Sequence, residues 1–132
     1  QPSVVVAKEP TMFRYAATVV RVVDGDTMYF DVDLGFTIHF RLDVRLKGVN
    51  TPETRGPTRE AGLKSKAFVE QALPVGALVV LNTYKAEKYG RYLADVIYLP
   101  GAKTRDEILA KGTLLNKELI DKGLAVPFMV DG

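Results

Sequence analysis

Apolar and polar residues alternate from residue 28 to residue 46, directly after a β-branched apolar run, and this pattern constrains the fold more than any other feature. Alternation with a period of two is typical of β-strands that bury one face. Asp-Gly-Asp at 24–26 and Leu-Gly at 34–35 interrupt the pattern with residues that favour turns. The segment therefore predicts three strands joined as a meander: Val19–Val23, Met28–Leu34 and Phe36–Leu46.

Residues that break regular structure follow the meander, with Asn50-Thr51-Pro52 and Gly56-Pro57 in an irregular loop. Thr58 can then cap a helix that ends at Pro74, because apolar residues recur beyond it on one face at helical spacing. These apolar residues are Ala61, Phe68, Val69, Ala72 and Leu73.

Two more β-rich runs, Leu78–Tyr84 and Tyr92–Leu99, predict a fourth and a fifth strand. Thr104 and the glutamate three residues later form a capping-box pattern, which predicts a short helix with Gly112 as its C-cap. A last helix is expected from about Leu114 to Lys122, ending at a glycine.

Five strands, with one helix between the third and fourth and another after the fifth, are compatible with an OB-fold, a small and partly open β-barrel. We therefore expect an α+β protein, a five-stranded barrel with helices, in a single domain over residues 1–132. A chain of this length buries roughly two-thirds of its unfolded surface, so it needs no disulfide or structural metal. The absence of cysteine excludes disulfides, zinc–cysteine sites, iron–sulfur clusters and a cysteine nucleophile.

No apolar run approaches the ~20 residues of a membrane-spanning helix, so we expect no membrane partner. Residues 1–10 lack a basic segment leading into an apolar stretch, and no signal peptide is expected there. Neither observation decides the compartment, because a cysteine-free domain folds equally well in the cytosol and outside the cell.

The net charge of +2 conceals an uneven distribution. Residues 18–44 include two basic and five acidic residues, whereas residues 45–66 include six basic and two acidic ones. Such a distribution is compatible with a cation-binding site beside a polyanion-binding surface. Taken alone, it is better explained by two ordinary solvated faces.

Four short stretches combine acids, basic residues and turn residues. Asp24-Gly25-Asp26-Thr27 places two carboxylates at a tight turn, where they can supply oxygen ligands to a hard cation such as calcium. Arg45–Thr54 and Lys88–Ala94 each bring an arginine next to a loop, and an arginine can form two parallel hydrogen bonds to a phosphate. Asn116–Ala125 is more typical of core packing.

The order and spacing of these four motifs resemble the staphylococcal nuclease (thermonuclease) family, from about Thr18 to Phe128. The resemblance implies an OB-fold and a calcium-dependent phosphodiesterase that cuts DNA, RNA or both and leaves 3′-phosphate ends. Family members are often secreted, although nothing in this chain shows export. We expect a monomer whose partner is the nucleic-acid substrate.

The same resemblance implies a role for each motif residue. Asp26 would bind calcium directly with Asp24 nearby, and the Thr51 carbonyl and the side chain of Asn50 would also face the metal. Glu53 would act as general base or orient the attacking water. The phosphate would be held by Arg45 and Arg91, and a neighbouring phosphate by Lys88 and Tyr89.

These roles agree with the chemistry of phosphodiester hydrolysis. In-line attack develops charge on the non-bridging oxygens, and two guanidinium groups and a divalent cation stabilise that charge most in the transition state. A carboxylate must then orient or deprotonate the water. The single histidine, His39, excludes a two-histidine mechanism, and its phase opposite to Ile38 and Phe40 predicts a solvent-facing side chain.

Asn50 departs from the family pattern, because the best-known members carry a calcium-binding aspartate at this position. Asparagine keeps a carbonyl oxygen but removes one negative charge, and charge count tunes calcium affinity. We therefore expect weaker calcium binding, or help from another carboxylate such as Asp31 or Asp33.

Alternative readings remain for the protein and for single residues. The main rival to a nuclease is a non-catalytic OB-fold module that binds nucleic acid with a weakened metal site, which Asn50 favours. A structural or inhibitor-like domain leaves the clustered polar residues without an explanation. Arg45 could be a structural arginine paired to Asp26 or Glu53. Tyr89 could simply cover the barrel edge, and Lys88 could be a solvated turn residue.

Overall fold

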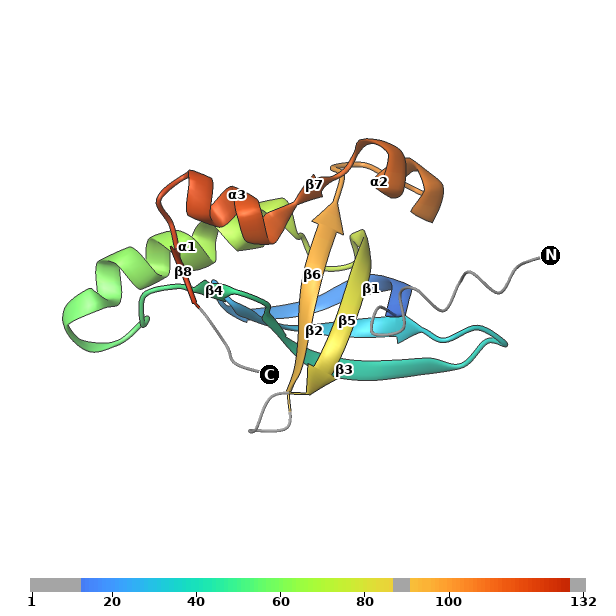
Figure 1. Ribbon diagram of the computed structural model, residues 1–132, viewed down its shortest axis with the longest axis horizontal. Helices are drawn as coiled ribbons and strands as arrows, with labels where there is room; N and C mark the ends of the chain where they lie inside the picture. The colour runs from blue at the N-terminus through green and yellow to red at the C-terminus, as the bar shows by residue number, and fades with distance from the viewer. Residues whose placement is uncertain (1–12, 87–90, 129–132) are drawn as a thin grey trace.

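Five long strands close into a mixed β-barrel in the computed structural model, which describes residues 13–86 and 91–128 (Figure 1). The strands follow the sheet order β3-β2-β1-β5-β6, and a parallel pairing of β3 with β6 closes the barrel. Their bounds are β1 Phe13–Asp24, β2 Thr27–Asp33, β3 His39–Leu46, β5 Leu78–Ala86 and β6 Tyr92–Tyr98. The predicted OB-fold class, a five-stranded α+β barrel, is confirmed.

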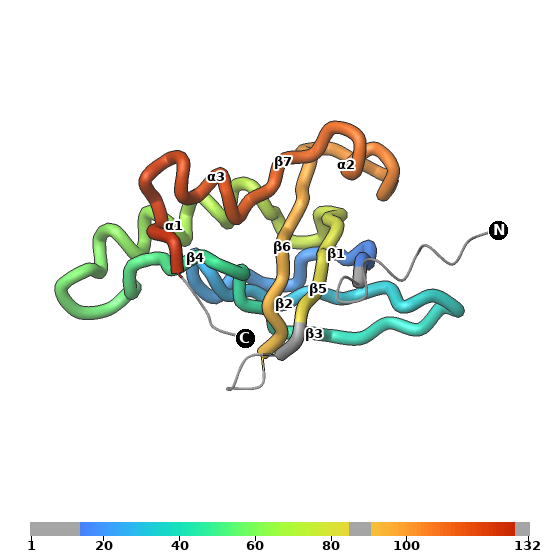
Figure 2. The backbone as a smooth tube through the Cα atoms, viewed as in Figure 1, coloured from blue at the N-terminus to red at the C-terminus, as the bar shows by residue number. Residues whose placement is uncertain are grey.

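Three α-helices, a short 3-10 helix and three short strands complete the described part of the chain. In the view of Figure 2, α1 and α3 both lie above the same end of the barrel, with α2 beyond the end of β6. The helices are α1 Arg59–Ala72, α2 Arg105–Lys111 and α3 Leu115–Asp121. The short strands are β4 Val49–Asn50, β7 Thr113–Leu114 and β8 Val126–Pro127.

The barrel interior follows from the predicted alternation. Met28, Phe30 and Val32 on β2 are at most 2% exposed, whereas Tyr29 and Asp31 between them are only partly buried. Apolar residues from α1 and α3, together with those of the strands, complete one continuous core. The hydrophobic effect supplies most of the free energy by which this core stabilises the fold, because its side chains are almost completely removed from water.

The predicted strand Phe36–Leu46 is wrong at its start, since β3 begins only at His39. Phe36 and Thr37 adopt the left-handed φ angles +56° and +62°, which turn the chain at the hairpin tip. β1 pairs with β2 only as far as Ala17↔Val32, so the tip of the β2–β3 hairpin extends beyond β1. The apolar residues of the tip are consequently exposed: Leu34, Phe36, Ile38 and Phe40.

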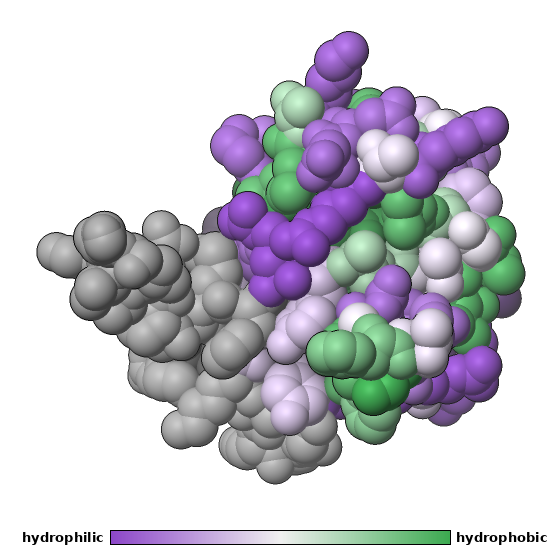
Figure 3. Space-filling view, turned by 90° about the vertical axis from the view of Figure 1, so that its right-hand side faces the viewer, coloured by the Kyte–Doolittle hydropathy of each residue, from purple (hydrophilic) through white to green (hydrophobic). Residues whose placement is uncertain are grey.

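Figure 3 faces the end of the molecule that carries this hairpin, and hydrophobic surface lies there among hydrophilic residues. His39 is solvent-facing as predicted, with its Nδ1 3.5 Å from Asp31 Oδ1. Ile38 and Phe40, which lie on the opposite face of the strand from His39, were expected to be buried but are exposed as well.

The predicted first strand, Val19–Val23, is the second half of a longer one. β1 begins at Phe13, and its earlier residues pair with β5, from Phe13↔Thr83 to Thr18↔Leu78. Before Ala17 the strand pairs with β5 and not with β2, and the hydrogen bonds to β5 extend it beyond the apolar run that the sequence shows.

The helix predicted after Thr58 forms, and four of the five residues of its predicted apolar face lie in or pack against the core, whereas Ala61 and the cap differ from the prediction. Gly62, Ser65 and Val69 are buried, whereas Ala61 is exposed. The Thr58 side chain does not cap α1, because a short 3-10 helix at Gly56–Thr58 leads into it.

The other helix ends agree with the sequence. The capping box of α2 is present, with the Thr104 hydroxyl accepting from the Glu107 N–H and the Glu107 carboxylate accepting from the Thr104 N–H. Gly112 is its C-cap residue. α3 occupies most of the predicted 114–122 segment, and the chain turns at Gly123 with a φ of +73°.

Candidate functional site

The candidate site lies at one end of the barrel, where the β1–β2 turn meets the segment that follows β4. Gly25 in this turn allows close packing, since a Cβ there would lie 2.8 Å from Thr51 Cγ2 and 3.0 Å from Ser65 Cβ. A larger residue would separate these segments. The turn that carries Asp26 is therefore held against both the β4 segment and α1.

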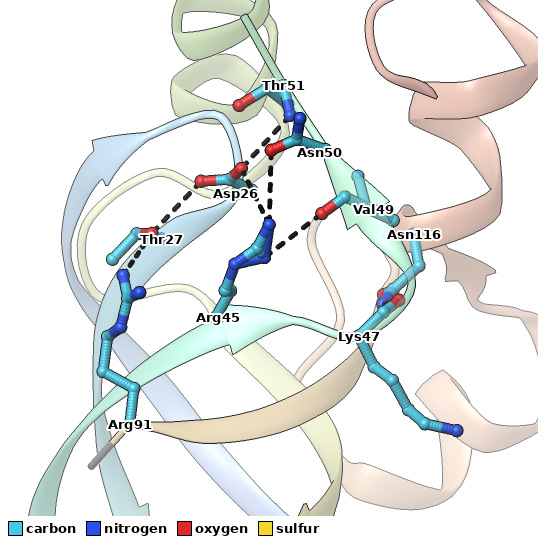
Figure 4. A network of polar contacts seen from close by, with 9 residues as sticks. All are labelled: Asp26, Thr27, Arg45, Lys47, Val49, Asn50, Thr51, Arg91 and Asn116. Carbon is cyan, nitrogen blue, oxygen red and sulfur yellow. Dashed lines mark hydrogen bonds and ion pairs between the residues drawn. The ribbon is translucent and has the colours of Figure 1, made fainter. Parts of the chain in front are cut away.

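Asp26 is 9% exposed, and both of its carboxylate oxygens accept hydrogen bonds (Figure 4). The Thr51 N–H donates to Oδ2 at 3.1 Å, and the Thr27 hydroxyl donates to Oδ1 at 3.1 Å. Arg45 Nη2 lies 3.8 Å from Oδ2, as an ion pair. A buried carboxylate needs such partners, because burial removes its hydration.

The guanidinium of Arg45 is buried at the end of β3, where it contacts β4. Its Nη1 donates to the Val49 carbonyl at 3.4 Å, and its Nη2 donates to Asn50 Oδ1 at 3.3 Å. The ring of Phe128 covers the guanidinium, 4.8 Å from Cζ to the ring centroid. Arg45 therefore pairs with Asp26, one of the two partners considered for a structural arginine.

A second guanidinium reaches the same carboxylate indirectly. Arg91 lies just before β6, and its Nη1 donates to the Thr27 hydroxyl at 3.3 Å. That hydroxyl in turn donates to Asp26, so Figure 4 shows one chain of contacts from Arg91 through Thr27 and Asp26 to Arg45. Residues from β2, β3 and the start of β6 thus gather around one acid.

Asp24 is the second acid of the turn, and its Oδ1 is buried without a hydrogen-bond partner among the described residues. Burial raises the pKa of this carboxyl above its ordinary value, and the negative charges of Asp26 and Glu53 raise it further. Lys66 and Arg91 oppose the shift by favouring the ionised form. The site therefore contains a carboxylate oxygen that accepts no hydrogen bond from the described residues.

Glu53 lies on the loop between β4 and α1, and its side chain is exposed. α1 packs directly on the main chain of this loop, because a Cβ at Gly62 would lie 2.2 Å from the Glu53 carbonyl oxygen. The Thr58 hydroxyl donates to the same carbonyl oxygen at 3.0 Å. These contacts hold the backbone of Glu53 while its carboxylate faces solvent.

The acids around Asp26 are few. In residues 13–86 and 91–128, no three His, Asp or Glu side chains lie together as a metal site. The oxygen atoms at the site that could bind a metal ion are those of the two turn carboxylates, the Asn50 amide and the main chain at Thr51. Such a set fits a hard, oxygen-seeking cation that keeps several waters better than a softer metal that needs nitrogen or sulfur.

Asp31 and Asp33 do not compensate for Asn50, which corrects that part of the prediction. They lie four and six residues along β2 from Thr27, roughly 14 and 20 Å away at the rise of a β-strand. Asp33 instead accepts from the Gly35 N–H in the hairpin. The predicted substrate contacts Lys88 and Tyr89 lie outside the described residues.

Sequence reasoning missed three residues that shape the site: Thr27, Gly62 and Phe128. Thr27 belongs to the Asp-Gly-Asp-Thr motif, so the sequence shows that it follows Asp26 but not that its hydroxyl accepts a hydrogen bond from Arg91. A glycine inside a helical pattern is costly without a packing reason, which was the available signal for Gly62.

The motif around Asn116 is structural, as expected. Its Nδ2 donates to the carbonyls of Lys47 and Ala94 at 3.0 and 3.1 Å, and its Oδ1 accepts from the Val96 N–H. These bonds fasten α3 to the middle of β6 and to the residue that follows β3.

Comparison with known proteins agrees with this geometry. Residues 43–131 match the family described as staphylococcal nuclease homologue, which is more than half of the chain. The chain belongs to this family. The matched segment contains Arg45, Asn50, Thr51, Glu53 and Arg91, whereas the Asp24–Thr27 turn precedes it.

One relative of this staphylococcal nuclease homologue is a protein of Methanocaldococcus jannaschii described as "Uncharacterized protein MJ1439". The two are 32% identical over 104 residues, an alignment that covers 62% of this chain and 48% of the relative. The chain thus spans about half the length of the curated relative it matches.

Membership of the staphylococcal nuclease homologue family suggests a nuclease-like function and a nucleic-acid partner. Among the helices of the described segments, none combines the length and hydrophobicity required to cross a bilayer.

Proposed function

We propose that this domain is a metal-dependent phosphodiesterase that hydrolyses DNA, RNA or both and leaves 3′-phosphate products. The observation that carries the proposal is the convergence of two guanidinium groups, from Arg45 and Arg91, on a turn that contains two acids. Guanidinium groups bind phosphate, whereas carboxylates repel it, so their combination favours a site that takes both a phosphate and a cation.

Arg45 approaches the turn from the end of β3 and Arg91 from the residue before β6, which suits a phosphate held from two sides. Each guanidinium carries five N–H donors, and the contacts of Arg45 with Val49 and Asn50 use two of them. Donors fixed before the reaction stabilise the charge that develops on the non-bridging oxygens. The two arginines therefore act chiefly on the transition state.

The cation we propose is Ca²⁺, held by Asp24, Asp26, Asn50 and the main chain of Thr51. The buried and unpartnered Oδ1 of Asp24 supports this assignment, since a cation would supply its missing partner. When bound, the ion would polarise the phosphate and offset its negative charge. Because Asn50 is neutral, we expect the affinity to be lower than with a third carboxylate.

Glu53 is the proposed general base or water-positioning residue. Its loop is fixed at the backbone by Gly62 and Thr58, and its exposed carboxylate has access to water. The negative charge of Glu53 helps to raise the pKa of Asp24, which supports a role for Glu53 close to the turn acids. Lys88 and Tyr89 remain proposed contacts to a neighbouring phosphate.

A non-catalytic nucleic-acid-binding module is the second candidate, and one observation favours it. The Asn50 side-chain oxygen accepts from Arg45, so this neutral residue serves the arginine in the structure rather than a cation. A binding module would need the basic groups but gains nothing from the buried Asp26 or from Asp24, whose buried Oδ1 has no hydrogen-bond partner among the described residues. The acids therefore favour the enzyme.

Digestion of single- and double-stranded DNA and RNA, each in calcium, magnesium or chelator, tests the proposal. Wild type should cleave with calcium and not with chelator. Glu53→Gln should lower kcat by about 10²–10⁴-fold, and Arg91→Ala by about 10²–10³-fold. Glu60→Gln and Arg105→Ala, at exposed helix positions, are charge-matched controls that should cleave at the wild-type rate.

The outcomes separate the two candidates. Binding of nucleic acid without cleavage in any metal would reject the nuclease and support the binding module. Cleavage that survives both Glu53→Gln and Arg91→Ala would reject the proposed site.

A further inference from the structure

We propose that Phe128 is a positioning residue, whose ring fixes the guanidinium plane of Arg45 for phosphate binding. The proposal rests on the proposed function of Arg45 and adds a residue that none of the site motifs contains. Its basis is the stack of the Phe128 ring on Arg45, with 4.8 Å from Cζ to the ring centroid. This separation lies within the range of a cation–π interaction.

The backbone brings Phe128 to this position through the strand that carries the partners of Arg45. β8 pairs antiparallel with β4, as Val49↔Pro127 and Asn50↔Val126, and the Phe128 N–H donates to the Gly48 carbonyl at 2.9 Å. β4 therefore holds the guanidinium along its edge, through hydrogen bonds to Val49 and Asn50. Phe128, which follows β8, covers the face of the guanidinium.

Ordinary core packing does not explain this aromatic residue. Phe128 is 42% exposed and does not belong to the buried core cluster of the described chain. An exposed phenylalanine gains little hydrophobic free energy compared with a buried one. Contact with a buried guanidinium is the interaction that its position provides.

The consequence for function follows from the neighbouring charge. Asp26 Oδ2 lies 3.8 Å from Arg45 Nη2, farther than a charge-assisted hydrogen bond. A guanidinium free to rotate would close on this carboxylate and withdraw its donors from a phosphate. A ring on one face restricts such rotation, and a preorganised arginine loses less entropy when its donors engage the substrate.

Three variants test the proposal in the intact chain. Phe128→Leu removes the aromatic face but keeps an apolar side chain, Phe128→Tyr keeps the face, and Val126→Ala alters another exposed residue of β8. Thermal unfolding confirms that each variant is folded. We expect Phe128→Leu to lower kcat about tenfold with little change in KM, and the other two to stay within about twofold of wild type.

A readout independent of cleavage is the side-chain NMR signal of Arg45. The ring current of Phe128 should shift this signal, and the shift should persist in Phe128→Tyr and disappear in Phe128→Leu. Titration with inorganic phosphate should perturb the Arg45 signal at lower concentration in wild type than in Phe128→Leu.

A double-mutant cycle identifies the residue through which Phe128 acts. In an Arg45→Lys background, Phe128→Leu should have no further effect on kcat, whereas additive losses would show that Phe128 acts elsewhere. An unchanged Arg45 signal in Phe128→Leu, or equal losses in the leucine and tyrosine variants, would overturn the proposal. Failure of wild type to cleave would reject the proposed function instead, and the NMR comparison would still decide the role of Phe128.

Discussion

The carboxylate of Asp26 accepts a hydrogen bond from the main-chain N–H of Thr51 at 3.1 Å, across 25 residues of sequence. This bond joins the β1–β2 turn to the segment after β4 and places the acid beside the arginine at the end of β3. The site thus depends on a long-range contact that also contributes to the stability of the barrel.

Replacing Asp26 with alanine should destabilise the protein by about 3–5 kcal/mol, because it leaves the buried Arg45 without its negative partner. Asp26→Asn should cost less, since an amide oxygen can still accept from the Thr51 N–H. Urea unfolding of both variants measures the difference. Equal losses would show that the carboxylate contributes no more than an uncharged side chain.

Asn50→Asp should tighten calcium binding by about tenfold, because it adds a negative charge beside the two turn acids. The new carboxylate can keep the hydrogen bond that Arg45 now donates to the Asn50 oxygen. Isothermal titration with calcium measures the affinity, with Asn50→Ser as a neutral control. A variant that failed to bind calcium more tightly would contradict the proposed ligand role of this position.

Gly62→Ala should destabilise the protein by about 1–3 kcal/mol. At an exposed helix position without this contact, the same change stabilises a protein by about 1 kcal/mol. The sign of the change in the free energy of unfolding therefore shows whether α1 packs on the Glu53 loop. Here the new Cβ would lie 2.2 Å from the Glu53 carbonyl oxygen and 2.8 Å from that of Pro52, both of which are main-chain atoms. Chemical denaturation measures stability, and the rate of nucleic-acid cleavage reports displacement of the Glu53 loop. Ala61→Ser, at the exposed neighbouring position, should change neither.

Tyr84 should contribute stability that is lost in alkali. Burial, together with the hydrogen bond to Asp95 and the charge of that carboxylate, raises the pKa of Tyr84 from 10.0 to about 12. Since the folded state favours neutral tyrosine, the contribution is complete below the ordinary pKa and disappears as the pH rises through about 12. The free energy of unfolding of Tyr84→Phe should therefore fall less steeply than that of wild type above about pH 10. Parallel curves would contradict the prediction.

Thr104→Ala should cost about 1 kcal/mol, because the Thr104 hydroxyl caps α2 by accepting from the Glu107 N–H at 3.2 Å. Thr58→Ala provides the comparison, since Thr58 precedes α1 without capping it. Instead its hydroxyl bonds to the Glu53 carbonyl, so its loss should affect cleavage more than helix stability. Unfolding curves and cleavage rates, measured on both variants, distinguish these effects.

The elements that sequence predicted well are those set by local contacts. The capping box at Thr104 forms as predicted, because a cap depends on residues three positions apart. The alternation on β2 also places Met28 and Phe30 correctly in the core, because every second residue of a strand faces the same side. These patterns were sufficient to predict a five-stranded barrel.

The errors occur where a neighbouring strand decides the outcome. β1 extends back to Phe13 because β5 pairs with that part of it. Ile38 and Phe40 alternate as core residues do, yet they are exposed because β1 does not reach the hairpin tip. Periodicity indicates which residues share a face, but not whether another element covers that face.

By itself, the sequence determined the succession of strands and main helices along the chain and the motifs that contain Asp26, Arg45, Glu53 and Arg91. Only the tertiary structure showed that Thr27 links Arg91 to Asp26 and that Phe128 covers Arg45. The physical reason is range: secondary structure depends on neighbours within a few residues, whereas a buried charge network depends on side chains that only the closed barrel brings within a few ångströms of one another.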